Sequence, residues 1–415
     1  MPEKINLEIA SPQSQIKTKS GIGLYLICLT ASLGGLLFGF DTAVISGAVD
    51  FVQKAFALGS LAVGWFVSSA LVGCILGAVV SGALSDRFGR KPILILSALC
   101  FFLCALLSAV SSNFACLIAA RILGGLGVGM ASVLAPMFVS EFSPPRLRGR
   151  LVALYQLSIV IGILAAYLSN WLLLANARNH PGSFGGTGWL HWLLITDVWR
   201  GMFGAGVVPA AAFFALLFFV PESPRWLVEA GQNGQAMVIL EEIRGPAVAA
   251  RELTEIQASL AQEEGTIGEL FQPGLRVALI IAVGLSVFGQ LSGVNIVVYY
   301  GPEILKSAHL PLQDAFQWQV VLGLINFIFT VIAIFLIDSR GRRPLLIGGM
   351  AAVTLSLGAT AALLYAGGHA TWIALLLCLY MGCVALSICA VIWVITAEIF
   401  PNRVRGRAMS IATFA

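Results

Sequence analysis

The sequence predicts an all-α protein that crosses a membrane about ten times. Apolar residues make up 59% of the 415 residues and charged residues only 11%, whereas soluble domains carry about 25% charged residues. Apolar stretches of about twenty residues recur along the chain, and a helix needs about that length to cross a bilayer. Lipid offers the backbone no hydrogen-bond partners, so these stretches must be helical.

Ten stretches meet this length. They lie near residues 22–47, 61–84, 93–112, 115–140, 151–174, 200–220, 277–300, 318–338, 345–366 and 371–396. The one long polar segment, residues 222–276, contains two amphipathic stretches at 234–243 and 251–262, which predict helices. We therefore expect a first bundle at 1–221 and a second at 277–415, joined by this linker.

The basic residues lie mainly on one side of the predicted membrane. The side of the N-terminus receives Lys17, Lys19, Arg87, Arg90, Lys91, Arg146, Arg148, Arg150, Arg340, Arg342, Arg343, Arg403, Arg405 and Arg407. The opposite side receives Lys54, Arg178, Arg200 and Lys306. Because Lys and Arg are retained on the cytoplasmic side, we predict a multi-pass protein of a plasma membrane or bacterial inner membrane with a cytoplasmic N-terminus.

Two loop patterns occur twice. The stretch at 86–92 (DRFGRKP) returns at 338–344 (DSRGRRP), and the stretch at 141–150 (EFSPPRLRGR) returns at 398–407 (EIFPNRVRGR). Each pair is six spans apart in the same orientation, which indicates a parallel duplication of a six-helix unit. By this symmetry we expect the second unit to be truncated after Ala415, lacking about two helices. A ten-span protein is the alternative.

The repeated loops place carboxylates and guanidiniums at helix ends on the predicted cytoplasmic face. Arg–carboxylate pairs at such a place can hold two bundles together and release when the bundles rock. The predicted gate contains Asp86, Arg90, Glu141, Arg148, Glu222, Arg225, Asp338, Arg342, Glu398 and Arg405. The alternative is that the arginines only fix the topology, which would not require Asp86, Gly89 and Glu141 to recur at matching positions.

Three further motifs carry a family resemblance. They are GGLLFGFD at 34–41, PESPRWL at 221–227, and QLSGVN at 290–295 followed by Tyr299-Tyr300. From about residue 22 to its C-terminus, the chain resembles the sugar porter family of the major facilitator superfamily. The resemblance implies the major facilitator fold of two six-helix bundles, here with the second incomplete, and a central sugar site served by alternating access.

Asp41 and Arg121 are ionisable residues inside predicted spans, where charge is costly and usually functional. Each lies about six residues from the outer end of its predicted span, so we expect an ion pair. An acid whose protonation depends on competition for an arginine is suited to proton coupling. Family members that resemble proton symporters carry an acid at the Asp41 position, so the resemblance implies coupling. The alternative is that Asp41 only holds its span against that of Arg121.

The resemblance also implies a sugar site. Gln156, Gln290, Asn295 and Asn326 would bond the hydroxyls, Trp393 would form the floor, and Phe38 a wall near Asp41. Amides donate and accept without charge, and aromatic rings fit the apolar faces of a pyranose. The alternative for each amide is a contact between helices.

The chain departs from the family at two places in this site. Gly289 stands where the family commonly has a glutamine, so one sugar hydroxyl would lose its partner. Cys389 and Ala390 stand where the family usually has Gly-Pro, and both are compatible with an unbroken helix.

We predict a secondary active transporter that imports a hexose or pentose together with a proton. Its partners would be the sugar, protons and the lipid bilayer, and it would act as a monomer without a cofactor or metal, driven by the proton gradient. A facilitative sugar, polyol or cyclitol carrier remains an alternative, as does an inactive truncated transporter or a sensor. An enzyme is disfavoured because the sequence shows no nucleophile–base pattern, metal-ligand cluster or phosphate loop. The net charge of +4 gives no indication of nucleic-acid binding.

Overall fold

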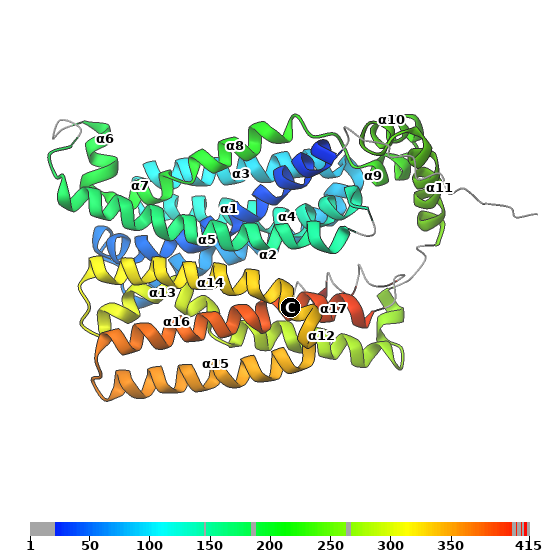
Figure 1. Ribbon diagram of the computed structural model, residues 1–415. Coiled ribbons are helices and arrows are strands. Elements are labelled where there is room, and N and C mark those ends of the chain that lie inside the picture. Colours follow the sequence, from blue (N-terminus) through cyan, green and yellow to red (C-terminus); the bar gives the residue numbers. More distant parts are fainter. Residues whose placement is uncertain are drawn as a thin grey trace, which may run out of the picture.

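The protein folds into two helical bundles that lie side by side (Figure 1). The computed structural model describes residues 21–144, 147–183, 188–262, 267–400, 404, 408 and 411–412. The first bundle contains α1 (Gly21–Ala55), α2 (Ser60–Phe88), α3 (Arg90–Val110), α4 (Phe114–Phe142), α5 (Arg148–Asn179), α6 (Trp189–His191), a π-helical turn (Trp192–Thr196), α7 (Val198–Gly204) and α8 (Val207–Leu217). The second contains α12 (Leu275–Leu291), α13 (Val294–Ser307), α14 (Leu312–Arg340), α15 (Arg342–Tyr365), α16 (Ala370–Leu386) and α17 (Ile388–Ile399).

The polar linker forms short helices at one end of the first bundle. They are α9 (Pro224–Glu229), α10 (Asn233–Arg244) and α11 (Pro246–Gln262), followed by a 3₁₀ turn at Ile267–Phe271. The two helices predicted in this segment are thus confirmed as α10 and α11. Both are amphipathic, and α9 to α11 share a small apolar cluster that includes Leu227, Ala236 and Leu260.

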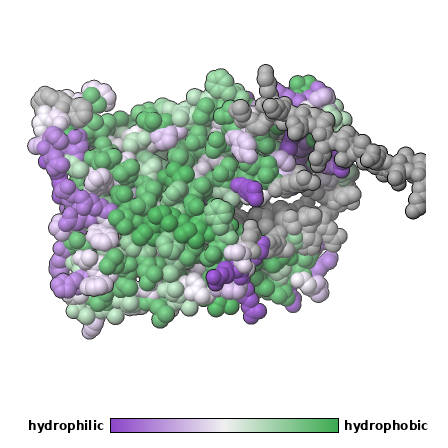
Figure 2. All heavy atoms as spheres, viewed as in Figure 1, coloured by the Kyte–Doolittle hydropathy of each residue, from purple (hydrophilic) through white to green (hydrophobic). Residues whose placement is uncertain are grey.

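The all-α membrane fold is confirmed. In the part of the chain that the structure describes, nine helical stretches are long and apolar enough to cross a membrane, and Ala370–Leu386 is a shorter one that α17 continues. Figure 2 shows a broad band of hydrophobic residues between polar residues at the two ends of the molecule. This is the surface expected of a protein whose sides face lipid.

Two spans are interrupted near their middle. α12 gives way to α13 at Gly293, whose φ of +89° is in the left-handed region that glycine tolerates. The hydroxyl of Tyr380 donates to the carbonyl oxygen of Ser292 over 3.1 Å, so this freed acceptor is satisfied within the protein. α16 gives way to α17 at Ser387 (φ −105°, ψ −92°).

Cys389 and Ala390 lie within α17, as their compatibility with an unbroken helix predicted, whereas the interruption of this span at Ser387, just before them, was not predicted. Ser387 donates its hydroxyl to the carbonyl oxygen of Cys383 over 2.6 Å. A serine that bonds the preceding turn in this way competes with regular helix geometry. Gly349 of α15 faces the break, and a Cβ atom there would overlap the side chain of Ser387.

The first span is longer than predicted, because α1 continues to Ala55 rather than ending near residue 47. Asp50 and Lys54 make this last part polar, but they form an i,i+4 ion pair of 2.8 Å that suits a helix. Asp41 therefore lies fourteen residues before the end of its helix rather than about six, while its predicted pairing with Arg121 is unaffected.

In the described parts of the chain, the bundles share a core at one end and have separate cores at the other. We call the end that carries Arg90, Arg148 and Arg342 the basic end, and the opposite end, where α1 and α13 finish, the far end. Toward the far end one apolar cluster spans both bundles; its members include Val44, Tyr167, Val298, Phe316 and Ile373. Toward the basic end the first bundle has its own cluster, which includes Leu94, Phe138 and Phe213. The second has another around Leu279 and Phe400.

Candidate functional site

Asp41 and Arg121 form a buried ion pair inside the first bundle. Nη1 of Arg121 donates to Oδ1 of Asp41 over 2.6 Å, and both terminal nitrogens approach the Asp41 carbonyl oxygen at 3.4–3.5 Å. The side chains are 2% and 14% exposed for Arg121 and Asp41, respectively. The ring of Phe203 on α7 lies 5.6 Å from the guanidinium carbon, within cation–π range. The ion pair predicted from the sequence is confirmed.

Close packing of α1 against α5 fixes the position of Asp41. Gly39 of α1 lies against the backbone of Ile159, and Gly162 of α5 lies against the backbone of Leu36. A Cβ atom at either glycine would overlap the facing carbonyl oxygen, so the two backbones touch directly. Asp41 lies two residues beyond Gly39 on α1, so this packing also fixes the position of its side chain relative to Arg121 of α4.

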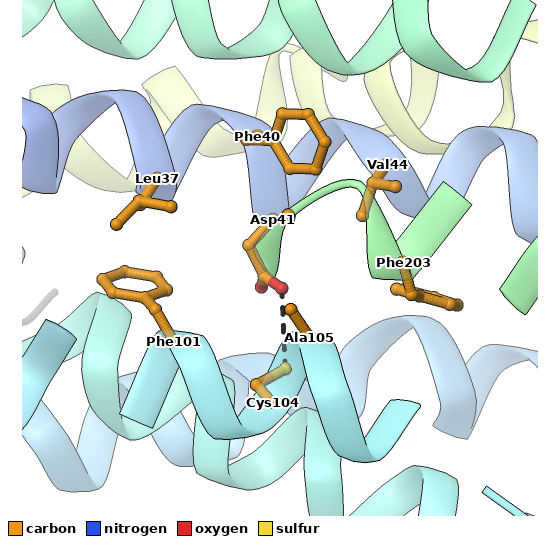
Figure 3. A pocket seen from close by; sticks show the side chains of 9 residues that line it. Leu37, Phe40, Asp41, Val44, Phe101, Cys104, Ala105 and Phe203 are labelled. Carbon is orange, nitrogen blue, oxygen red and sulfur yellow. Dashed lines mark hydrogen bonds between the residues drawn. The ribbon is translucent and has the colours of Figure 1, made fainter. Parts of the chain in front are cut away.

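A small cavity adjoins the carboxylate of Asp41 (Figure 3). Its volume of about 20 Å³ is sufficient for one water molecule. Leu37, Phe40, Val44, Phe101, Cys104, Ala105, Phe203 and Gly206 complete the lining. Cys104 of α3 donates its thiol to Oδ1 of Asp41 over 3.8 Å.

Two of the predicted sugar-binding residues meet across the break between α12 and α13. Nδ2 of Asn295 donates to Oε1 of Gln290 over 2.8 Å, and Gln290 is exposed. Discontinuous helices free backbone and side-chain polar groups at the middle of a membrane, where transporters place substrate sites. The break therefore puts two amides at a position suited to a polar solute.

The other predicted sugar-binding residues come from several helices. Gln156 on α5 is half-buried, as is Phe38 on α1, while Asn326 on α14 is 9% exposed. α5 and α14 pack against each other between the bundles. Trp393 belongs to α17, but its side chain lies outside the described residues. The binding roles of these residues stay predictions.

Gly289 allows α17 to approach α12. A Cβ atom on Gly289 would lie 2.7 Å from Cδ1 of Ile392 and 3.3 Å from Cγ1 of Ile388. The position that carries a glutamine in the family pattern is therefore filled here by aliphatic side chains from the facing helix.

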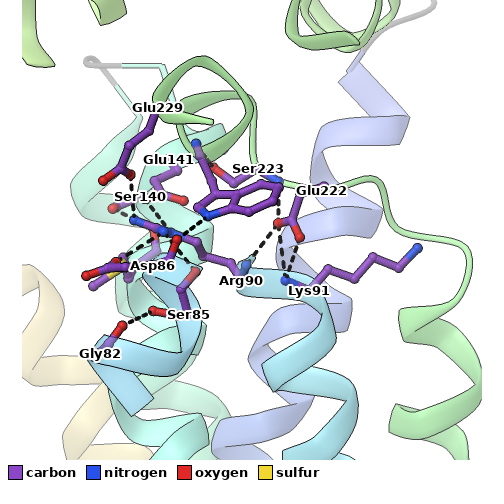
Figure 4. A network of polar contacts seen from close by, with 12 residues as sticks. Gly82, Ser85, Asp86, Arg90, Lys91, Ser140, Glu141, Glu222, Ser223 and Glu229 are labelled. Atoms are coloured by element: carbon purple, nitrogen blue, oxygen red, sulfur yellow. Dashed lines mark hydrogen bonds and ion pairs between the residues drawn. The ribbon is translucent and has the colours of Figure 1, made fainter. Parts of the chain in front are cut away.

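Arg90 is the centre of a polar network at the basic end (Figure 4). It is 5% exposed. Its guanidinium lies 3.2 Å from the carboxylate of Asp86, 3.5 Å from that of Glu141 and 3.5 Å from that of Glu229. It also donates to the carbonyl oxygen of Ser85 over 3.1 Å. Several carboxylates around one buried guanidinium fix the relative positions of α2, α3, α4 and α9.

Glu222 caps the start of α3 from the linker. Its carboxylate accepts the backbone N–H groups of Arg90 at 3.2 Å, Lys91 at 3.1 Å and Ser223 at 2.7 Å. An anion at a helix N-terminus is favoured by the unpaired N–H groups there. Burial raises the pKa of Glu222, while these N–H donors and Arg90 act in the opposite direction. Trp226 adds a bond from Nε1 to the carbonyl oxygen of Asp86 at 2.9 Å.

Four of the ten predicted gate residues, Asp86, Arg90, Glu141 and Glu222, meet in this network. Arg225 on α9 is half-buried and interacts electrostatically with Glu141. Arg148 is exposed at the start of α5, and Arg342 is half-buried at the start of α15. The side chains of Asp338 and Glu398, and all of Arg405, lie outside the described residues.

The contacts around Arg90 lie within the first bundle and α9. A gate that joins the two bundles at the basic end therefore stays a prediction. Sequence reasoning missed Glu229, which lies two residues beyond the PESPRWL motif on the same short helix.

Polar contacts that the sequence analysis missed join the bundles toward the far end. Nζ of Lys306 on α13 lies 2.8 Å from Oδ1 of Asp50 on α1. The hydroxyl of Tyr167 on α5 donates to the carbonyl oxygen of Val298 on α13 over 3.2 Å. Within the second bundle, Nε2 of Gln319 on α14 donates to the same carbonyl over 3.3 Å. The signal in the sequence that could have suggested the Lys306–Asp50 pair was the presence of charges of opposite sign near the predicted outer ends of these two spans.

Two apolar helical bundles, spans broken at mid-membrane and a buried ion pair beside a cavity define a polytopic membrane transporter. The family model described as "Sugar (and other) transporter" matches residues 27–415. The arabinose-proton symporter of Bacillus subtilis is 42% identical over 392 residues, which cover 94% of this chain and 82% of the relative. The D-xylose-proton symporter of Escherichia coli is 39% identical over 422 residues, with coverage of 94% and 82%.

Solved structures agree with this assignment. A partially occluded inward-open structure of the xylose transporter XylE from E. coli matches with a TM-score of 0.80 at 34% identity, covering 95% of this chain and 90% of that one. XylE bound to 6-bromo-6-deoxy-D-glucose matches with a TM-score of 0.79 at 36% identity, covering 95% and 86%. The chain belongs to the sugar transporter family of the major facilitator superfamily.

Proposed function

We propose that this protein is a symporter that imports a monosaccharide, a pentose or a hexose, together with a proton. The observation that carries the proposal is the buried ion pair between Asp41 and Arg121. The names of the relatives support it, since an arabinose-proton symporter and a D-xylose-proton symporter are 42% and 39% identical to this chain.

The ion pair supplies a chemical basis for coupling. A carboxylate buried without its partner is costly, so separation of Asp41 from Arg121 would favour protonation of Asp41. A helix movement that changes this distance therefore changes the affinity of the site for a proton. The cavity next to Asp41 is the place through which that proton would arrive.

The polar groups between the bundles favour a neutral, polyhydroxylated substrate. Gln156, Gln290, Asn295 and Asn326 offer amides that both donate and accept, which suits hydroxyl groups. The positive charge of Arg121 is matched by Asp41, so it is not available for an anionic substrate. Phe38 and Trp393 are assigned to the apolar faces of the sugar.

The separate cores at the basic end and the shared core at the far end correspond to one state of a transport cycle. If the basic end is cytoplasmic, as the distribution of Lys and Arg favours, the far end, which is closed in this state, faces outward and the N-terminus is cytoplasmic. Import would then require the far end to open to admit the sugar. The protein would act as a monomer in the bilayer, with the proton gradient as its energy source.

Uptake of labelled sugars tests this proposal. Cells that lack their own carriers would express the chain and receive D-xylose, L-arabinose or D-glucose, with and without a protonophore. We expect accumulation of at least one sugar, and its collapse with the protonophore. If the sugar reaches the same concentration inside and outside the cells but never accumulates, and the protonophore has no effect, the protein is a facilitator instead.

A further inference from the structure

Cys104 of α3 contacts the same carboxylate oxygen as Arg121. Its thiol donates to Oδ1 of Asp41 over 3.8 Å, and Cys104 is 2% exposed. We propose that Cys104 is a positioning residue for the proton step, whose thiol stabilises ionised Asp41 and thereby sets the pH range in which Asp41 takes up its proton. The inference rests on the proposed coupling role of Asp41.

Two neighbours orient the thiol. Oγ of Ser108, one turn further along α3, lies 3.9 Å from Sγ of Cys104. When this hydroxyl donates to the sulfur, the single thiol hydrogen is free to point at Asp41. On the facing helix α4, a Cβ atom at Gly124 would overlap Sγ, so the glycine provides the space that the thiol occupies. Gly124 lies three residues after Arg121, so one face of α4 supplies both the guanidinium and this space.

Titratable groups from four helices act on Asp41. Arg121 on α4 and Cys104 on α3 contact its carboxylate directly. Cys74 on α2 and Tyr299 on α13 interact with it electrostatically. Arg121 supplies the dominant attraction because it is charged, whereas a thiol is a weak donor. Cys104 therefore adjusts the proton step, and its loss is expected to shift a pH profile rather than abolish transport.

The test compares Cys104→Ala with Cys104→Ser, because alanine and serine have similar volumes and differ in the donor. In proteoliposomes, uptake of the labelled sugar that accumulates best would be measured from about pH 4 to about pH 9, a range that begins at the ordinary pKa of a carboxylate and covers values raised by burial. Without the donor, ionised Asp41 is less stable and holds its proton to higher pH. We expect Cys104→Ala to move the alkaline midpoint upward by about half a pH unit, and Cys104→Ser to keep the midpoint of the unsubstituted protein.

Cys100→Ala is the matched control. Cys100 is also buried on α3, one turn before Cys104, and lies beside Gly127 rather than Asp41. Its substitution should leave the midpoint in place. If Cys104→Ala impairs folding, Cys104→Val and Cys104→Thr repeat the comparison, because they share a shape and differ in the hydroxyl.

A common shift in the alanine and serine variants, or a shift in neither, would overturn the inference. The Asp41→Asn variant, measured in the same assay, distinguishes failure of the Cys104 inference from failure of the proposed function. If Asp41→Asn still accumulates sugar, proton coupling through Asp41 is itself wrong. If Asp41→Asn loses accumulation while the Cys104 variants behave alike, only the role of Cys104 fails.

Discussion

Lys306 of α13 and Asp50 of α1 form an ion pair of 2.8 Å that joins the two bundles at the far end. Asp50 also binds Lys54 on its own helix, at 2.8 Å. Because α1 belongs to the first bundle and α13 to the second, the Lys306–Asp50 pair exists only while the far end is closed. It therefore favours the state that the structure shows.

Replacing Lys306 by alanine should make the far end open more often. The Lys306 side chain is 39% exposed, and such a partly solvated pair contributes about 0.5–1 kcal/mol. We expect a roughly two- to fivefold shift of population toward the state with an open far end. Distances between spin labels at Ala55 and Ser307, measured by double electron–electron resonance in a background without reactive cysteines, would report it.

The control is the charge-reversed pair Asp50→Lys with Lys306→Asp, which should restore part of the closed population. A distance distribution that is identical in Lys306→Ala and the unsubstituted protein would mean that the pair does not bias the equilibrium.

Arg90→Ala should destabilise the first bundle strongly. The substitution leaves the carboxylates of Glu141 and Glu229 without their buried partner, a change that costs about 3–5 kcal/mol in buried pairs. Arg90→Lys keeps the charge but not the planar fork, so its loss should be smaller. Thermal unfolding of the purified protein in detergent gives the comparison.

Asp86→Ala provides the contrast for Arg90→Ala, because the Asp86 side chain is 63% exposed and solvated pairs contribute at most about 1 kcal/mol. Equal melting temperatures for the Arg90→Ala and Asp86→Ala variants would show that the network does not depend on Arg90.

Gly289→Gln should reduce transport even though it adds an amide to the predicted sugar site. The new Cβ atom would meet Ile392 and Ile388 of α17, and overpacking of this kind costs about 1–3 kcal/mol. Adding Ile392→Ala should relieve the overlap and restore uptake. Initial uptake rates of Gly289→Gln and of Gly289→Gln with Ile392→Ala test this expectation. If Gly289→Gln alone takes up sugar faster than the unsubstituted protein, the packing argument is contradicted.

The helices were predictable because bilayer thickness sets their length, and apolar runs of that length are visible in the sequence. The ion pair of Asp41 and Arg121 was predictable because charges are rare inside such runs. The break at Ser387 was not, since it depends on a serine hydroxyl that bonds the preceding turn and on space left by Gly349.

Contacts between segments that are distant in the sequence could not be predicted either. The pairing of Lys306 with Asp50 depends on how two bundles meet. The approach of Glu229 to Arg90 depends on where the linker places α9. The sequence shows the charged residues, but periodicity and composition do not reveal which of them meet.

The most direct test of coupling is the pH change that accompanies sugar entry. Proteoliposomes containing the protein would be suspended in a weakly buffered solution with a pH-sensitive dye outside the vesicles, and the transported sugar would then be added. We predict that the external solution becomes more alkaline as sugar and protons enter the vesicles together. In Asp41→Asn this response should vanish, while Asp314→Asn, a matched change in the first turn of α14, should retain it. Sugar entry without alkalinisation, or a response that persists in Asp41→Asn, would contradict proton coupling through the Asp41–Arg121 pair.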